Sequence, residues 1–285
     1  MIFSNGIFRY CAEAVLGIDK RRQLPGIRRD RDLEKYESSF KGKKKVLYFP
    51  GCYAFLHYPE EVWAAIYVLE QNNITVKVLP LDCCGVVAIT QGDPRIAGKI
   101  NKNSKLLQLY LDDGWVVIAS SASCSLTLKQ DYTKLASADV MKSFSGKIYD
   151  FHEYLMQLHE QGALSEEFTP MPCAVAFHVP CHLLVQKKKN LVHELVKLIP
   201  GVKICQFEDS CCGIAGTFGF KKKNYEISMH IGRTLFNSIL TSKPDYIITS
   251  CGTCKIQLED GVKGRVYHTS ELLAAAYKGE RLPRD

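Results

Sequence analysis

The sequence has no uninterrupted apolar segment long enough to form a membrane-spanning helix. Such a helix needs about 20 consecutive apolar residues, and no run in the 285 residues approaches that length. An integral membrane protein is therefore excluded. The N-terminal residues also lack the basic start and the continuous apolar segment of a secretory signal. We expect a cytoplasmic protein, with peripheral attachment to the inner face of the membrane as an alternative.

The motifs of several common enzyme and binding classes are missing as well. We find no hydrolytic triad, phosphate-binding loop or nicotinamide fingerprint, and the glycine-rich residues 213–219 directly follow a cysteine pair, so they do not count as a nucleotide loop. The net charge is +7, and the basic runs are at residues 20–22, 28–31, 41–45, 187–189 and 221–223. No aromatic-interleaved basic strand accompanies them, so nucleic acid is not an expected partner. We interpret these runs as solvated surface, with an acidic partner or an anionic membrane surface as alternatives.

Cysteine, in contrast, is abundant. The chain contains 12 cysteines, and without a secretory signal, clustered thiols indicate metal or redox chemistry rather than disulfides. Five of them lie in three short pieces that each follow an apolar run: Cys181, Cys211-Cys212-Gly213 and Cys251-Gly252-Thr253-Cys254. We expect each piece at the end of a strand, where the chain turns toward a helix.

The same arrangement occurs earlier in the chain. Four cysteines recur at a nearly constant spacing of 128 to 130 positions: Cys52 with Cys181, Cys83 with Cys211, Cys84 with Cys212 and Cys124 with Cys254. This regularity indicates two copies of one unit of alternating strands and helices, joined by a polar segment at residues 160–172. The alternation predicts a mostly parallel sheet in each copy.

The predicted fold class is therefore α/β, with two pseudo-symmetric lobes that each contain a mostly parallel sheet and flanking helices. Residues 1–44 are expected to form an N-terminal helical or extended arm, residues 45–165 the first lobe and residues 173–285 the second. Parallel sheets place ligands at the carboxyl ends of their strands. The thiols of each lobe should gather there.

The five thiols of the second copy are the strongest metal-binding candidates. Thiolates are the ligands of iron–sulfur clusters and of zinc. A zinc ion takes four ligands and would leave one thiol over, so five convergent cysteines favour an iron–sulfur cluster. Structural zinc and buried, unliganded thiols are the alternatives. Cys211 and Cys212 can face one site together only from a sharp turn, which Gly213 permits.

The first copy has only four thiols, because Ser121 stands where the repeat predicts a fifth. These thiols are Cys52, Cys83, Cys84 and Cys124. Four thiols suffice for zinc or for a cubane iron–sulfur cluster, and an empty, vestigial site is a third alternative.

The other cysteines and two histidines receive no role in metal binding or catalysis. Cys11, Cys173 and Cys205 have no counterpart in the repeat, and we expect them to serve packing or to lie at the surface. His178 and His182 flank the lone cysteine of the second copy. We interpret both as structural, with hydrogen bonding to a cluster as the alternative.

These motifs resemble the CCG domain, a cysteine-rich domain of the pattern Cys…Cys-Cys-Gly…Cys-x-x-Cys. The domain is shared by the B subunit of heterodisulfide reductase and by the iron–sulfur subunits of glycolate oxidase and lactate-utilisation systems. Residues 17–22, 120–124, 211–222 and 251–255 look most like the C subunit of anaerobic glycerol-3-phosphate dehydrogenase. That protein normally begins with a ferredoxin-like segment carrying two Cys-x-x-Cys-x-x-Cys-x-x-x-Cys-Pro motifs, which this sequence does not contain.

The resemblance implies which residues bind a cofactor and what the protein does. One [4Fe–4S] cluster, or an unusual non-cubane cluster, would be ligated by Cys181, Cys211, Cys212, Cys251 and Cys254. A protein with clusters and no organic-cofactor site most simply moves electrons. We expect an electron-transfer subunit that passes electrons toward quinone from a flavin dehydrogenase, of glycerol-3-phosphate or 2-hydroxy-acid type, or from a ferredoxin-like partner. The alternatives are a heterodisulfide-type thiol–disulfide reductase and a structural metal-binding protein.

Overall fold

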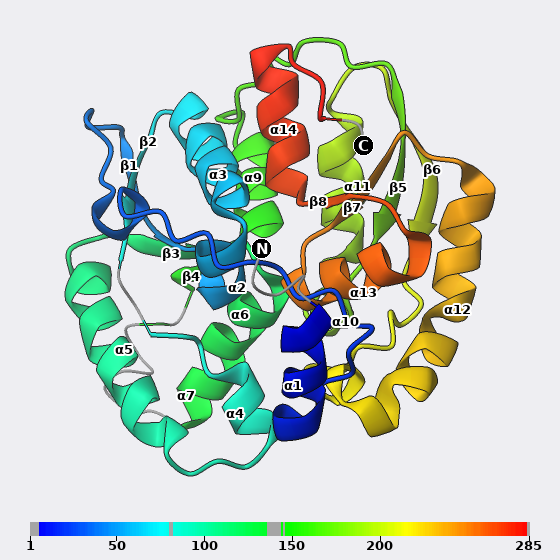
Figure 1. The fold of residues 1–285 in the computed structure, drawn as a ribbon. Coiled ribbons are helices and arrows are strands. Elements are labelled where there is room, and N and C mark those ends of the chain that lie inside the picture. The colour runs from blue at the N-terminus through cyan, green and yellow to red at the C-terminus, as the bar shows by residue number, and fades with distance from the viewer. Residues whose placement is uncertain (1–5, 80–81, 136–143, 145, 284–285) are drawn as a thin grey trace.

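The computed structural model describes residues 6–79, 82–135, 144 and 146–283 (Figure 1). Its strands form two four-stranded sheets in which every pair is parallel. The first sheet has the order β2-β1-β3-β4 and contains β1 (Lys44–Phe49), β2 (Ile74–Val78), β3 (Val116–Ala119) and β4 (Ile148–Asp150). The second has the order β6-β5-β7-β8 and contains β5 (Cys173–His178), β6 (Val202–Glu208), β7 (Tyr246–Thr249) and β8 (Val266–Tyr267). The predicted fold class is confirmed, because both sheets connect their strands in the same order.

Helices flank both sheets. The N-terminal segment contains α1 (Gly6–Leu16) and η2 (Leu33–Lys35). The first lobe contains α2 (Gly51–His57), α3 (Pro59–Gln71), α4 (Val86–Thr90), α5 (Ile96–Asp112), α6 (Ala122–Leu126), η3 (Thr127–Asp131), α7 (Tyr132–Leu135) and α9 (Phe151–Glu160). The second contains α10 (Cys181–Val185), α11 (Lys189–Lys197), η4 (Phe218–Phe220), η5 (Lys222–Asn224), α12 (Tyr225–Ser242), α13 (Gly252–Val262) and α14 (Thr269–Lys278). None of these helices is both long and apolar enough to cross a bilayer.

One hydrophobic core joins the two lobes. The apolar face that the helical spacing predicts in α3 is buried, and it packs against α14 of the second lobe. Figure 1 shows these two helices side by side. Val62 and Ile66 of α3 belong to the same core cluster as Leu272 and Leu273 of α14. The halves of the chain are thus held together by apolar burial as well as by the covalent connection.

The connection between the lobes is more apolar than the sequence predicts. We expect a polar segment at residues 160–172, but Leu164, Phe168 and Met171 are buried in the shared core. The Phe168 ring lies 4.4 Å from the ring of Tyr277 in α14, measured between centroids. The segment is therefore packed onto the second lobe, and its charged residues occupy the outer side.

Only some of the regularly spaced apolar residues of α12 are buried. Ile227, Ile231, Leu235 and Ile239 recur at helical spacing, but Ile227 and Ile231 are exposed and only Leu235 and Ile239 are buried. The helix instead turns Gly232 toward the cysteine pair, where an added Cβ would lie 2.5 Å from the carbonyl oxygen of Cys212. The rotation of this helix therefore buries Leu235, Phe236 and Ile239 in the core and also lets its backbone approach the cysteine pair closely.

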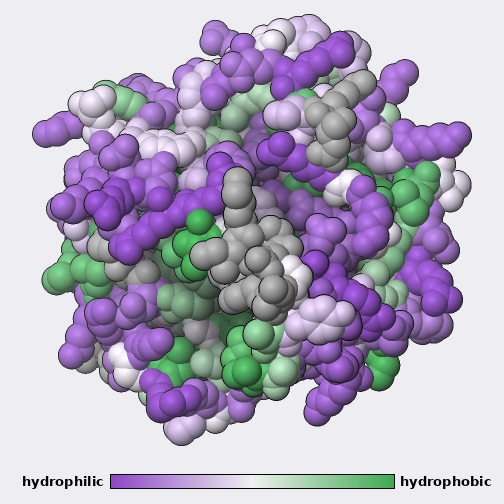
Figure 2. Space-filling model, viewed as in Figure 1, coloured by the Kyte–Doolittle hydropathy of each residue, from purple (hydrophilic) through white to green (hydrophobic). Residues whose placement is uncertain are grey.

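The N-terminal segment is not simply a solvated arm. Ile18 forms an antiparallel bridge with Lys221, and the Asp19 amide donates to the Phe220 carbonyl at 2.8 Å. In the basic run at residues 20–22 we expect exposed side chains, but Arg22 is fully buried. The interpretation of the runs as solvated surface is wrong for this residue. Figure 2 shows a largely hydrophilic face elsewhere, with apolar residues in small, separate groups.

Candidate metal centres

The cysteines of the second lobe follow three neighbouring strands of one sheet. Cys181 is the first residue of α10 after β5, and Cys211 and Cys212 follow β6. Cys251 caps the N-terminus of α13 after β7, and Cys254 lies in the first turn of that helix. Since the strands are parallel, their carboxyl ends meet at one edge of the sheet, as expected for a ligand site in such folds.

Distances and electrostatics show that these thiols lie together. The Cys212 and Cys254 sulfurs are 3.3 Å apart. Burial raises the pKa of Cys181, and the nearby charges of Cys251, Cys212 and Cys211 raise it further. The five cysteines that the sequence assigns to this site are thus neighbours: Cys181 lies near Cys211, Cys212 and Cys251, and Cys212 lies beside Cys254.

The second site combines buried and exposed thiols. Cys212, Cys251 and Cys254 are buried, whereas Cys181 and Cys211 are exposed. A hydrogen bond from Cys254 holds the pKa of Cys251 at about 5 despite its burial. Cys254 itself has a pKa well above its usual value because it shares hydrogen bonds with Cys212 and Cys251. The arrangement stabilises a thiolate, the form that binds metals.

A glycine in the left-handed region follows each cysteine pair. Gly213 and Gly85 both have φ of +88°. A Cβ at Gly213 would lie 2.1 Å from the Ser228 carbonyl oxygen, so no other residue fits without a backbone shift. The amides of both glycines donate to the first sulfur of their pair, to Cys211 at 3.4 Å and to Cys83 at 3.5 Å.

The first lobe gathers its four thiols in the same way. Cys52 lies in the first turn of α2, and its sulfur is 3.4 Å from that of Cys83. Hydrogen bonds shared with Cys124 and Cys83, together with burial, raise the pKa of Cys84 well above its usual value. Ser121 caps the N-terminus of α6, the position that Cys251 occupies at α13. The structure therefore confirms that Ser121 occupies, in the first lobe, the position that Cys251 has in the second.

The donor chemistry of both sites fits an iron–sulfur group. Within the described residues, no three His, Cys, Asp or Glu side chains are arranged to hold a single metal ion. Thiols without a carboxylate or imidazole partner are the usual ligands of iron–sulfur clusters, and the fifth thiol of the second site exceeds the four ligands that a zinc ion takes.

The first lobe contributes directly to the second site. The Ser123 hydroxyl lies 3.8 Å from the Cys251 sulfur and 2.7 Å from Nδ1 of His182. The Ala122 amide donates to the Ser250 carbonyl at 3.1 Å. Because Ser123 precedes Cys124 in α6, adjacent residues of one helix contact the two sites. The sequence motifs did not reveal this role for Ser123.

A second contact also crosses from the first lobe to the second. Tyr53 packs so closely on Gly252 that an added Cβ would lie 1.8 Å from the tyrosine ring. Tyr53 follows the lone cysteine of the first lobe, and His182 follows that of the second. In each lobe, the residue after the lone cysteine thus reaches the other lobe's cysteine loop. The spacing of 129 between Tyr53 and His182 is the only signal of this relation in the sequence.

The remaining candidates have structural positions. His178 is buried beside the Thr249 hydroxyl at 3.1 Å, and burial lowers its pKa to about 4, so it is neutral at pH 7. Cys173 lies in β5 and is buried, and the Cys205 sulfur donates to the Val175 carbonyl. Cys11 is exposed on α1.

Comparison with known proteins agrees with this duplicated architecture. The profile of the cysteine-rich domain CCG matches residues 46–129 and again residues 175–259. The C subunit of anaerobic glycerol-3-phosphate dehydrogenase from Escherichia coli K12 is 32% identical over 277 residues, which cover 94% of this chain and 69% of that protein.

More distant relatives carry names of the same kind. The glycolate oxidase iron–sulfur subunit of Escherichia coli K12 is 24% identical over 84% of this chain and 59% of its own length. The D subunit of the dihydromethanophenazine:CoB–CoM heterodisulfide reductase of Methanosarcina barkeri is 24% identical over 77% of this chain and 54% of its own length. One domain profile matches the chain twice, and a relative aligns with 94% of the chain; the chain therefore belongs to the CCG cysteine-rich domain family.

Proposed function

We propose that the chain is an iron–sulfur electron-transfer subunit of an oxidoreductase complex. The observation that carries the proposal is the pair of thiol-only sites linked by adjacent residues: Cys124 belongs to one site, and Ser123 touches Cys251 of the other. The names of the relatives, which are subunits of oxidoreductases, support the same role.

The residues of each site have defined roles in this proposal. One cluster is ligated by Cys181, Cys211, Cys212, Cys251 and Cys254, and a second by Cys52, Cys83, Cys84 and Cys124. When bound, an iron–sulfur group supplies one-electron redox chemistry. The amides of Gly213 and Gly85 donate to cysteine sulfurs. Such bonds stabilise the negative charge on the ligands and tune the potential.

The exposed thiols indicate where electrons enter and leave. Cys52 in the first site and Cys181 and Cys211 in the second are exposed, whereas Cys84, Cys124, Cys212, Cys251 and Cys254 are buried. A redox partner would therefore approach these outer edges. In this proposal the donor is a flavin dehydrogenase acting on glycerol 3-phosphate or a 2-hydroxy acid, or a ferredoxin-like protein, and the acceptor is a quinone. The names of two relatives, a glycerol-3-phosphate dehydrogenase subunit and a glycolate oxidase subunit, support the two substrate classes.

Iron and sulfide analysis tests the proposal. Anaerobically purified protein should contain iron and acid-labile sulfide and give an electron paramagnetic resonance signal upon reduction. Cys212→Ser should lose the signal of the second site, because Cys212 is buried beside Cys254. Cys205→Ser, outside both sites, should keep it. Stoichiometric zinc without acid-labile sulfide would refute the proposal.

Exposure of the second site supports one alternative. Since Cys181 and Cys211 are exposed, a disulfide substrate can reach the edge of this site. A heterodisulfide-type thiol–disulfide reductase would use it. Reduced protein should then be reoxidised by small disulfides but not by a quinone, and an electron-transfer subunit should show the reverse.

A further inference from the structure

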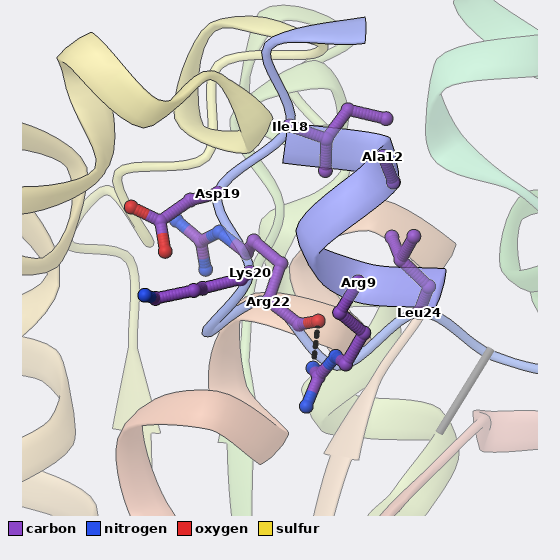
Figure 3. Close-up of a pocket in the computed structure, with 7 residues that line it drawn as sticks. All are labelled: Arg9, Ala12, Ile18, Asp19, Lys20, Arg22 and Leu24. Carbon is purple, nitrogen blue, oxygen red and sulfur yellow. Dashed lines mark hydrogen bonds between the residues drawn. The ribbon is translucent and has the colours of Figure 1, made fainter. Parts of the chain in front are cut away.

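Arg22 carries a fully buried guanidinium group into the second lobe. Its side chain has 0% exposure, as does that of its ion-pair partner Asp260. The backbone around it is fixed as well, since Arg9 donates a hydrogen bond to the Arg22 carbonyl oxygen (Figure 3). Arg9 and Arg22 line a hollow beneath α1 of only about 10 Å³, far below the roughly 300 Å³ of the smallest ligand pockets. Arg22 therefore belongs to a packed structural element, not to a substrate pocket.

One branch of the Arg22 hydrogen bonds leads to the cysteine pair. Nη2 donates to the Ser228 hydroxyl at 2.9 Å, and this hydroxyl donates to the Gly213 carbonyl at 2.8 Å. Nε donates to the Gly219 carbonyl at 2.8 Å, at the other end of the same glycine-rich loop. The Gly213 amide donates in turn to Cys211. Arg22 thus fixes both ends of the loop that presents Cys211 and Cys212.

The other branch leads to the helix that carries two further thiols. Nη1 donates to Asp260 at 3.0 Å and also to Gln257, and both acceptors lie on α13. Gln257 donates to the Ser228 carbonyl at 3.2 Å. Since α13 begins at the Cys251 cap, its position sets that of Cys251 and Cys254. Only the planar, five-donor guanidinium can serve these separate acceptors at once.

We propose that Arg22 is a positioning residue of the second cysteine site, one that holds the cysteine-pair loop and α13 in the relative placement that a cluster requires. This inference rests on the proposed function for the identity of the cluster. A buried ion pair is weak evidence of stability by itself, because desolvation offsets much of the attraction. Its placement between two ligand-bearing elements is the reason to assign it to the site.

In the first lobe, different residues hold the cysteine pair Cys83-Cys84, so the first site is an internal control for the loss of Arg22. There, Nδ2 of Asn103 donates to the Asp82 carbonyl at 3.0 Å and to the Tyr132 hydroxyl at 3.0 Å. An added Cβ at Gly85 would meet the side chain of Ile96, not backbone. Loss of Arg22 should therefore affect the second site and spare the first.

The test compares Arg22→Met with Arg21→Met in the full-length chain. Arg21 is the matched control, because its guanidinium also lies over the Tyr225 ring but its side chain is 48% exposed. Loss of a residue that orients metal ligands typically weakens metal binding by about 10–100-fold. We expect a chelator to bleach the second cluster of the Arg22→Met protein at least about 10-fold faster, with a shifted reduction potential and altered resonance signal. Arg22→Lys keeps the positive charge and should therefore show a smaller change than Arg22→Met.

Further measurements separate the possible outcomes. Cys84→Ser removes the first cluster and isolates the signal of the second. If Arg22→Met does not fold, Ser228→Ala removes the same link with a small change in volume, and it should give the same shift in potential. Equal behaviour of the Arg22 and Arg21 variants, or equal loss of both clusters, would overturn the inference.

A readout without metal distinguishes this inference from the proposed function. In metal-free protein, Arg22→Met should speed alkylation of the buried Cys212 relative to Cys84, and Arg21→Met should not. If wild-type protein holds no iron, the proposed function fails, but this comparison still tests Arg22. An unchanged ratio of the two alkylation rates would then refute it.

Discussion

Replacing Lys255 by methionine should strongly destabilise the contact between the lobes. The Lys255 ammonium is buried at 3% exposure, 2.5 Å from Glu61 of α3 and 3.9 Å from Glu271 of α14. It also lies 3.9 Å from the centre of the Tyr58 ring. Burial alone would lower the pKa of Lys255, but Glu61 and Glu271 outweigh burial and raise it. The lysine is therefore charged and is shared by elements of both lobes.

The expected cost follows from what the substitution leaves behind. Breaking a buried ion pair by removing one partner costs about 3–5 kcal/mol, because the other charge stays buried. Burial already raises the pKa of Glu271 to about 7, so in the variant this carboxyl can take up a proton and limit the loss. We expect Lys255→Met to lower the free energy of unfolding by about 3 kcal/mol at pH 7. A buried carboxyl with a raised pKa in the folded protein lowers the unfolding free energy as pH rises through that pKa, because the charged form is then buried. The loss caused by Lys255→Met should therefore be larger at pH 8 than at pH 6.

Urea unfolding followed by circular dichroism measures this cost. The control is Lys197→Met, which breaks a pair with Glu194 whose side chains are 53% and 54% exposed; such surface pairs contribute at most about 1 kcal/mol. In a double-mutant cycle, Glu61→Gln should recover part of the loss caused by Lys255→Met. A cost for Lys255→Met no larger than that of the control, or one that does not depend on pH, would refute the reasoning.

Three other outcomes are expected. Gly252→Ala should destabilise the lobe interface by about 1–3 kcal/mol through overpacking, because its Cβ would lie 1.8 Å from the Tyr53 ring; Tyr53→Ala in the same chain should reverse part of this loss in urea unfolding. Burial lowers the pKa of His178 to about 4. The stability that the neutral His178 contributes is therefore present above the unfolded pKa of about 6.5 and is lost as pH falls toward 4. Between pH 7 and pH 5 the wild type should therefore lose about 2 kcal/mol relative to His178→Gln, and equal losses would contradict this assignment. Gly213→Ala should reduce iron content more than Gly85→Ala, since its Cβ would meet the Ser228 backbone and not the flexible Ile96 side chain; equal iron contents would contradict this.

The features that the sequence predicts are those encoded by local pattern or by repetition. Apolar runs identify strands buried on both faces, and the spacing from Cys52 to Cys181 identifies the duplication. Together they place the cysteine pieces at the carboxyl ends of parallel strands. The two matches to one domain profile confirm the family, and the assignment of each ligand stays a prediction.

The features that the sequence hides depend on contacts between distant residues. Arg22 lies in a run of basic residues that reads as surface, and its acceptors are about 200 positions away. Lys255 directly follows a cysteine, but its partner Glu61 lies in the other lobe. Gly252 looks like a flexible turn residue, whereas the Tyr53 ring occupies the space a side chain would need. No local sequence pattern indicates which surfaces of the two lobes contact each other.

The crossed contacts of Tyr53 and His182 bear on how such a chain arose. Each lobe covers the cysteine loop of the other, so a single copy of the repeat would leave its own loop uncovered. An ancestor with one copy could have completed its sites only as a symmetric homodimer. In this chain the two copies differ: Ser121 stands where the other copy has Cys251, and the Arg22 side chain bonds to residues of the second lobe. A chain cut within residues 161–172 should accordingly regain its structure only when both fragments are mixed.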